Sequence, residues 1–183
     1  MAAMALIAGG AGFFGIAWQL LMAAEERATG YLNFLVGLFG TLIALGGLAT
    51  KDLTVPVSLY LLLFSTYFLF EGGVGLFGIG YRAHGFYTLF AGIMLAITGG
   101  LLLGDAIGAM TVPGGAIKLT EMVLGIVGIG FFVPAILRFW HLALDKPGLR
   151  PWVGWVYLIA TWVLLVVPGV VILANVIYRF AAA

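Results

Sequence analysis

Six long apolar runs follow one another along the chain, and a short polar or charged stretch separates each run from the next. Each run has about the 20 residues that an α-helix needs to cross a lipid bilayer. The pattern therefore predicts an all-α integral membrane protein, with six transmembrane helices as three consecutive helical hairpins in a single domain over residues 1–183. The predicted helices cover residues 4–22, 31–49, 57–79, 85–104, 119–140 and 151–178.

Composition supports this class and excludes several others. Of the 183 residues, 64% are hydrophobic and only 8% are charged, whereas a soluble domain is about 25% charged. The net charge is +1 without a basic cluster, so we expect no nucleic-acid partner. The sequence has no cysteine, two distant histidines and no evident nucleophile–base pattern. We therefore expect no metal site, no cofactor and no enzymatic activity.

The distribution of basic residues predicts an orientation in the membrane. Five fall in the first, third and fifth connections, and three fall on the opposite side. Lysine and arginine are enriched in cytoplasmic loops, so we expect a multi-pass protein of the cell inner (plasma) membrane with both termini outside. The five are Arg27, Arg82, Arg138, Lys146 and Arg150, and the three are Lys51, Lys118 and Arg179.

Glu71 is the most informative residue, because it places a carboxyl group inside a predicted membrane span. It lies about eight residues, or about 12 Å, from the end of the third predicted helix. We expect no lysine or arginine at a comparable depth in another span. Charged groups inside a membrane usually face a cavity or a partner. We therefore expect Glu71 either to be wetted by a pore or to be protonated; the simplest alternative is a neutral carboxyl hydrogen-bonded to a neighbouring helix.

An aromatic stripe leads to this carboxyl group along one face of the third helix. Its members are three or four residues apart, the spacing that brings side chains onto one helix face. Ring faces, hydroxyl groups and one acceptor would suit a small planar amide, although aromatic stripes also serve in ordinary helix packing. The stripe consists of Tyr60, Phe64, Tyr67, Glu71, Gly75 and Gly78.

Glycine and proline predict how the helices pack and bend. Glycines three or four residues apart allow close helix contact in membranes, and prolines inside a span kink it. The charged residues near the ends of the fifth helix have simple interpretations: a local ion pair, and long side chains that reach the interface. The glycine pairs are Gly100–Gly104 and Gly125–Gly128, the prolines are Pro134 and Pro168, the ion pair is Lys118–Glu121, and the interfacial residues are Arg138, His141 and Asp145.

Three short motifs carry a resemblance to a known family. Residues 31–37 read Tyr-Leu-Asn-Phe-Leu-Val-Gly, residues 62–67 read Leu-Leu-Phe-Ser-Thr-Tyr, and the last helix opens with Pro151-Trp152. In order and spacing, these segments resemble the second, third and last helices of the bacterial urea channel and short-chain amide transporter family (AmiS/UreI). The first contains that family's asparagine-phenylalanine-x-valine-glycine motif.

The resemblance implies six helices per protomer, a hexameric ring, outward termini, and a pore through each protomer for urea or small amides. By position, it assigns pore or pore-supporting roles to Asn33, Phe64, Tyr67, Phe68 and Trp152. The chain departs from the family at residues 125–132, which lack its several tryptophans, and in its histidines, which fall on the predicted cytoplasmic side. The resemblance is therefore weakest for proton gating and for urea as the specific solute.

The sequence thus predicts a membrane channel or facilitator for a small uncharged solute such as urea or a short-chain amide. We expect it in the lipid bilayer as a homo-oligomer, a hexamer by resemblance. Two alternatives remain: a non-transporting structural subunit of a larger membrane assembly, and a proton-coupled carrier that uses its intramembrane carboxyl group. The expected pore residues are Glu71, Tyr67, Phe64, Phe68, Tyr60, Asn33 and Trp152.

Overall fold

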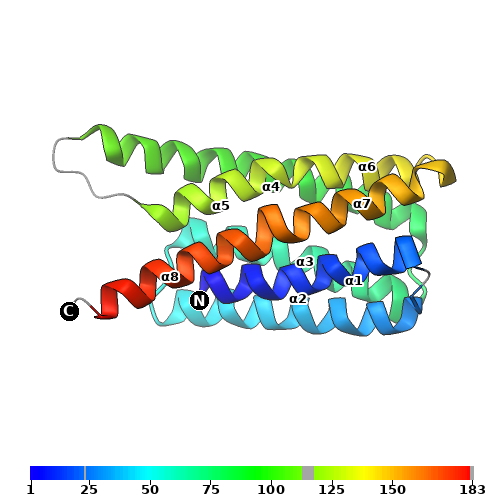
Figure 1. Ribbon diagram of the computed structural model, residues 1–183, viewed down its shortest axis with the longest axis horizontal. Helices are drawn as coiled ribbons and strands as arrows, with labels where there is room; N and C mark the ends of the chain where they lie inside the picture. Colours follow the sequence, from blue (N-terminus) through cyan, green and yellow to red (C-terminus); the bar gives the residue numbers. More distant parts are fainter. Residues whose placement is uncertain (23, 113–117, 182–183) are drawn as a thin grey trace.

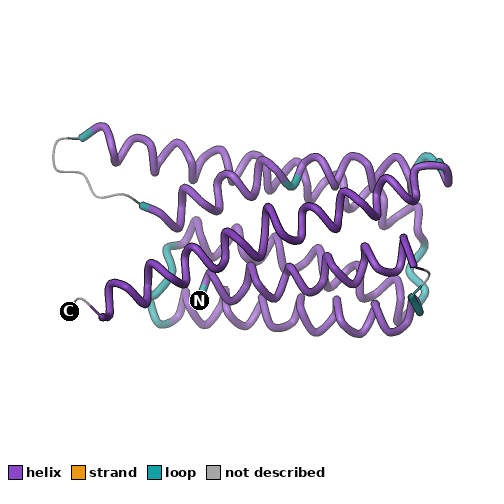
Figure 2. Tube along the Cα trace, in the orientation of Figure 1, coloured by secondary structure: helices purple, strands orange, loops and turns teal. Residues whose placement is uncertain are grey.

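The computed structural model describes residues 1–22, 24–112 and 118–181, and six helical segments in them are long and apolar enough to cross a membrane (Figure 2). The predicted fold class is therefore confirmed. The first four segments are single helices, and the last two are interrupted. The elements are α1 (Ala2–Met22), α2 (Glu26–Ala49), α3 (Val55–Phe77), α4 (Tyr81–Thr111), α5 (Leu119–Gly130), α6 (Phe132–Leu142), η1 (Pro147–Leu149), α7 (Arg150–Ala160), η2 (Thr161–Val166) and α8 (Val167–Ala181).

Two helices extend further than the apolar runs predict. α2 begins at Glu26 rather than residue 31, and α4 runs from Tyr81 to Thr111 rather than over residues 85–104. Backbone hydrogen bonds continue into the membrane interface, so charged residues that interrupt an apolar run form the outer turns of the helix. Part of the predicted connection between the fourth and fifth spans, residues 113–117, lies outside the described residues.

Both predicted proline sites coincide with a change in helix geometry. The fifth span is divided at Phe131, three residues before Pro134. In the sixth span, the π-helical turn η2 ends directly before α8, in which Pro168 is the second residue; the Val167 N–H donates to the Trp162 carbonyl, five residues earlier. Proline has no N–H to donate, and such wide turns are a common way to accommodate an interrupted helical ladder.

The six segments form a ring in chain order around a common axis. Each helix packs against its neighbours in sequence, and the last span closes the ring by packing against α1. Figure 1 shows both termini at one end of the bundle, which we call the terminal end. The α1–α2, α3–α4 and α6–α7 connections lie at the opposite end, which we call the distal end.

Glycines bring neighbouring helices of the ring into close contact. A Cβ atom on Gly72 of α3 would lie 2.6 Å from the backbone nitrogen of Phe34 in α2, and Gly99 of α4 packs directly against Gly125 and Gly128 of α5. The packing role is confirmed for Gly125 and Gly128. It is wrong for the pair Gly100–Gly104 within one chain, since no atom of the described residues lies within 4 Å of where their Cβ atoms would be.

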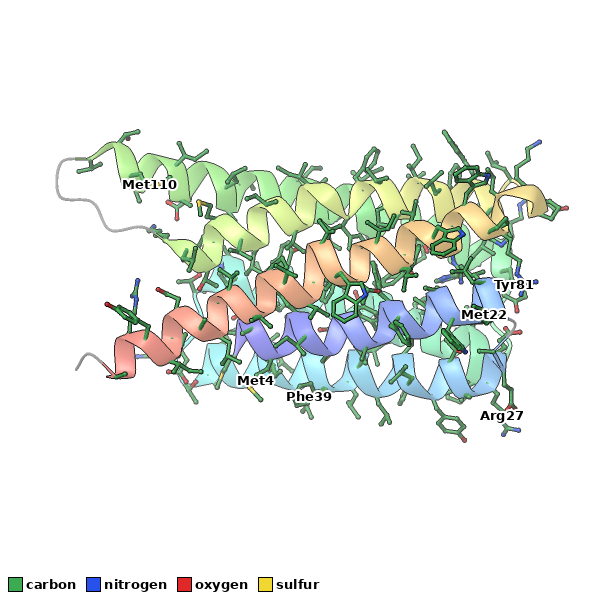
Figure 3. All side chains as sticks on the ribbon, in the orientation of Figure 1. Met4, Met22, Arg27, Phe39, Tyr81 and Met110 are labelled. Atoms are coloured by element: carbon green, nitrogen blue, oxygen red, sulfur yellow. The ribbon has the colours of Figure 1, made fainter. Side chains whose placement is uncertain are left out.

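The outer surface of the bundle is covered with large apolar side chains, which is the surface that lipid requires. Figure 3 shows side chains projecting outward along the whole length of the helices, with Phe39 of α2 among them. In the same view Met22, Arg27 and Tyr81 lie at the distal end, and Met110 lies toward the terminal end. With six apolar spans and this surface, the chain is a multi-pass membrane protein.

Candidate functional site

Six aromatic side chains fill the axis of the ring near its middle, and we call them the aromatic cluster. Four helical spans contribute them, and each is no more than 2% exposed. The rings are in mutual contact, for example Phe13 with Tyr157 at 4.5 Å and Phe64 with Phe68 at 5.0 Å between centroids. The cluster consists of Phe13, Phe64, Tyr67, Phe68, Phe131 and Tyr157.

Glycines of α1 make room for these rings. A Cβ atom on Gly9 would lie 2.6 Å from the ring of Phe64, and one on Gly12 would lie 2.5 Å from the ring of Phe68. Such distances are too short for carbon–carbon contact, so neither position accepts a larger side chain without moving an aromatic ring. The glycines of α1 and the stripe of α3 are therefore one packing unit on the axis.

Polar atoms lie within and beside the aromatic cluster. The hydroxyl groups of Tyr67 and Tyr157 are hydrogen-bonded to each other at 2.7 Å. Asn33 donates from Nδ2 to the carbonyl oxygen of Thr29 at 2.9 Å, but its Oδ1 has no hydrogen-bond partner among the described residues. The hydroxyl of Tyr60, toward the terminal end, also lacks a partner in this part of the chain. Buried polar atoms usually have partners, so both oxygens have unused hydrogen-bonding capacity.

Glu71 belongs to a buried group of three ionisable residues on the distal side of the aromatic cluster, which we call the charged cluster. Arg138 of α6 donates from Nη2 to Glu71 Oε1 at 2.7 Å, and His84 Nε2 of α4 contacts Glu71 Oε2. The exposed fractions are 5% for Glu71, 0% for His84 and 3% for Arg138. A buried carboxylate is tolerated when a cation and hydrogen bonds compensate it.

This geometry corrects four expectations from the sequence. Glu71 is not without a basic partner, because Arg138 lies at the same depth from another helix. Arg138 does not reach outward to the interface but inward to the carboxylate, and His84 is a buried residue of α4 rather than part of a connection. Glu71 is also six residues from the end of α3 at Phe77, about 9 Å. The charged cluster is thus off-centre in the membrane, where burying charge costs less.

Aromatic side chains hold the other two members of the charged cluster. The ring of His84 stacks on Phe70 with a 13° interplanar angle, and Phe70 stacks in turn on Tyr87. The guanidinium carbon of Arg138 lies 5.9 Å from the centre of the Tyr157 ring, a cation–π distance. Tyr157 therefore connects the charged cluster to the hydroxyl pair and to the aromatic cluster.

A polar vestibule at the distal end leads toward the charged cluster. It is a cavity of about 370 Å³, bordered by Gln19, Glu26, Tyr81, Arg138, His141 and Arg150 among others. A second cavity of about 10 Å³ continues inward and reaches Glu71. Arg138, Glu26 and Tyr81 border both cavities, and the Tyr81 hydroxyl donates to a carboxylate oxygen of Glu26. The charged cluster is therefore the inner boundary of a space that begins at the distal end.

The structure brings six of the seven predicted pore residues into the protein interior. Tyr60, Phe64, Tyr67, Phe68, Glu71 and Asn33 are all buried. Trp152 is not among them: it is 66% exposed on the outer surface, because the first turn of α7 directs it away from the axis. The stripe also ends earlier than predicted, since Gly78 terminates α3 in a left-handed conformation and is exposed.

The sequence interpretation missed Phe13, His84, Phe131, Arg138 and Tyr157. A usable signal existed for Arg138, which falls inside the fifth apolar run and is therefore an intramembrane ionisable residue. Its partner could not be read from spacing within one helix. At the terminal end, Lys118 pairs with Asp105 at 2.7 Å and not with Glu121 as predicted. This hydrogen bond raises the pKa of Lys118 above its usual value.

Comparison with known proteins agrees with this architecture. No curated protein matches the sequence of this chain. The cryo-EM structure of the Helicobacter pylori urea channel in its closed state has a TM-score of 0.73 and 18% identity, covering 95% of this chain and 98% of that one. The crystal structure of the urea channel from the same human gastric pathogen has a TM-score of 0.76 and 20% identity, covering 96% and 98%.

A sequence model of a whole protein family also matches this chain. The family model for AmiS/UreI family transporters matches residues 1–176, which include every membrane-spanning segment up to the last turn of α8. The two solved structures establish the shared fold, and the family match establishes the relationship. This protein is therefore a member of the AmiS/UreI family of transporters.

Proposed function

We propose that this protein is a passive channel for a small uncharged solute, such as urea or a short-chain amide. The proposed path follows the axis of the six-helix ring, from the distal vestibule past the charged cluster and through the aromatic cluster. The observation that carries the proposal is the aromatic cluster itself, with its hydroxyl pair at the centre of a transporter-family fold.

The aromatic cluster suits a flat, neutral molecule. Ring faces offer van der Waals contact to both sides of a planar amide, while tyrosine hydroxyls and the free Asn33 Oδ1 replace part of its hydration. Because the rings fill the axis, passage requires them to change rotamer. An ion would lose its hydration between apolar rings without an opposite charge to replace it. The cluster therefore favours neutral solutes.

The two alternative functions receive less support. A purely structural subunit does not account for membership of a transporter family. That membership also supports the prediction that the chain is not an enzyme. A proton-coupled carrier based on Glu71 required a carboxyl group without a basic partner, and Glu71 is paired with Arg138.

We further propose that the distal end faces the cytoplasm, that both termini face outward, and that the protein forms a homo-oligomer in the inner membrane. Arg27, Arg82, Lys146 and Arg150 all lie at the distal end, which supports this orientation through the enrichment of basic residues in cytoplasmic loops. The exposed glycines at positions 100, 104 and 108 of α4 leave room for a helix of a second copy.

Stopped-flow light scattering on proteoliposomes tests the proposed function. Vesicles containing the protein should take up acetamide or urea faster than empty vesicles, without ATP or an ion gradient. Vesicles reconstituted with an unrelated six-helix protein at equal density serve as the control for leakage. Uptake equal to that of empty vesicles for both solutes would refute the channel and favour the structural subunit.

A further inference from the structure

The charged cluster borders the distal vestibule through Arg138. Arg138 borders both the cavity of about 370 Å³ and the cavity of about 10 Å³ that touches Glu71. The smaller cavity holds no more than about one water molecule. A larger guest would therefore reach Glu71 only if the Arg138 side chain moved into the vestibule, which it already borders.

The hydrogen-bonding capacity of the charged cluster is not fully used. Arg138 uses Nη2 to bind Glu71, but its Nε–H has no acceptor among the described residues. A guanidinium has five N–H donors, and a carboxylate has about four acceptor sites. The direct contact between Arg138 and Glu71 therefore leaves donors and acceptors for a molecule that presents both in one plane.

Charge restricts what that molecule can be. The negative charge of Glu71 and the positive charge of Arg138 cancel within 2.7 Å. An added carboxylate or ammonium would leave a net charge in a buried cluster, which is strongly unfavourable. A neutral guest with one carbonyl acceptor and adjacent N–H donors leaves the balance unchanged. Those are the groups of a primary amide or a urea.

We propose that Glu71 and Arg138 form a recognition site for the planar amide group at the distal mouth of the pathway. The guest inserts between them: Arg138 donates to its carbonyl oxygen, and Glu71 accepts from its N–H. His84 acts as a positioning residue, because its contact with Glu71 Oε2 holds the carboxylate in place. This site rests on the proposed channel function and specifies its solute class, neutral molecules that carry a carbonyl and an N–H in one plane.

The test compares two permeabilities in the same vesicles. Acetamide and water permeability are measured by stopped flow for the wild type and for the double variant Glu71→Gln/Arg138→Met, which removes both charges at nearly constant volume. The acetamide-to-water ratio should fall about tenfold or more, the size expected for losing hydrogen bonds to charged groups. The matched control is Glu25→Gln/Arg82→Met, two exposed positions at the same end, and its ratio should not change.

A binding measurement separates this inference from the channel itself. Acetamide should raise the unfolding temperature of the detergent-solubilised wild type more than N,N-dimethylacetamide, which has no N–H donor, and the double variant should lose this difference. Should the double variant not fold, Arg138→Lys keeps the charge, removes the planar fork and should lose the preference as well. The site is refuted, and the channel stands, if the wild type conducts acetamide but two results are negative. These are an unchanged acetamide-to-water permeability ratio in the double variant, and a wild-type unfolding temperature that acetamide raises no more than N,N-dimethylacetamide does. Binding without conduction keeps the site and overturns the channel.

Discussion

Removing one member of the Glu71–Arg138 pair should destabilise the protein far more than removing both. Glu71 is 5% exposed and Arg138 is 3% exposed, so either charge left alone has little access to water. Breaking a buried ion pair from one side costs about 3–5 kcal/mol, whereas replacing both partners with well-packed neutral groups is close to neutral. The small adjoining cavity admits at most about one water molecule, so we expect values near 3 kcal/mol for Glu71→Gln and Arg138→Met singly.

Equilibrium unfolding in mixed micelles of mild detergent and dodecyl sulfate measures this effect. A loss of about 3 kcal/mol corresponds to about a hundredfold change in the unfolding constant. The double variant should be more stable than either single variant, which is a strongly non-additive cycle. The exposed pair of substitutions Glu25→Gln and Arg82→Met should add to within about 0.5 kcal/mol. Single variants as stable as the wild type, or a double variant that loses the sum of both, would refute the buried pair.

Three further predictions concern other parts of the bundle. Phe131→Ala removes a fully buried ring from the axis, so acetamide permeability should rise in proteoliposomes while the unfolding free energy falls by about 3 kcal/mol or more. Gly37→Ala places a Cβ 2.6 Å from a backbone nitrogen of α3 and should lower the midpoint of detergent unfolding. Gly46→Ala on the same helix meets no atom of the described part of the chain within 4 Å and should not lower it. Asp105→Asn should lower the pKa of Lys118 toward 10.5, which faster acylation of that amine near pH 10 would report. Because folding raises this pKa, the contribution of the pair to stability is complete at neutral pH and is lost as the pH rises past the pKa of Lys118 in the folded protein.

Periodicity within one helix was sufficient to predict much of the candidate site. The spacing of Tyr60, Phe64, Tyr67 and Glu71 identified the face of α3 that is buried, because positions three and four apart must share a face whatever the fold. The six spans followed from length and composition. Such predictions succeed because they depend on local geometry and on the requirement that lipid-facing groups be apolar.

What the sequence could not provide was the register between helices. Glu71, His84 and Arg138 come from three helices, and their meeting depends on how far each helix is shifted along the axis. A charged residue near the end of a span can reach toward the interface or toward a partner, and only the rotation of its helix decides which. The exposed position of Trp152 has the same origin, since half a turn of helix rotation separates the axis from the lipid.

The π-helical turn of the last span makes the length of this segment more critical than its composition. On its distal side, Tyr157 faces the axis; on its terminal side, Gly169 packs against Ile7 of α1. Successive residues of an α-helix are about 100° apart around its axis. Deleting a single residue from 161–166 would turn the fifteen residues of α8 by about that angle relative to α7, and would present Gly169 to lipid. Mutational tolerance here should therefore be high for substitutions on the outer face, such as at Val163, and very low for insertions or deletions.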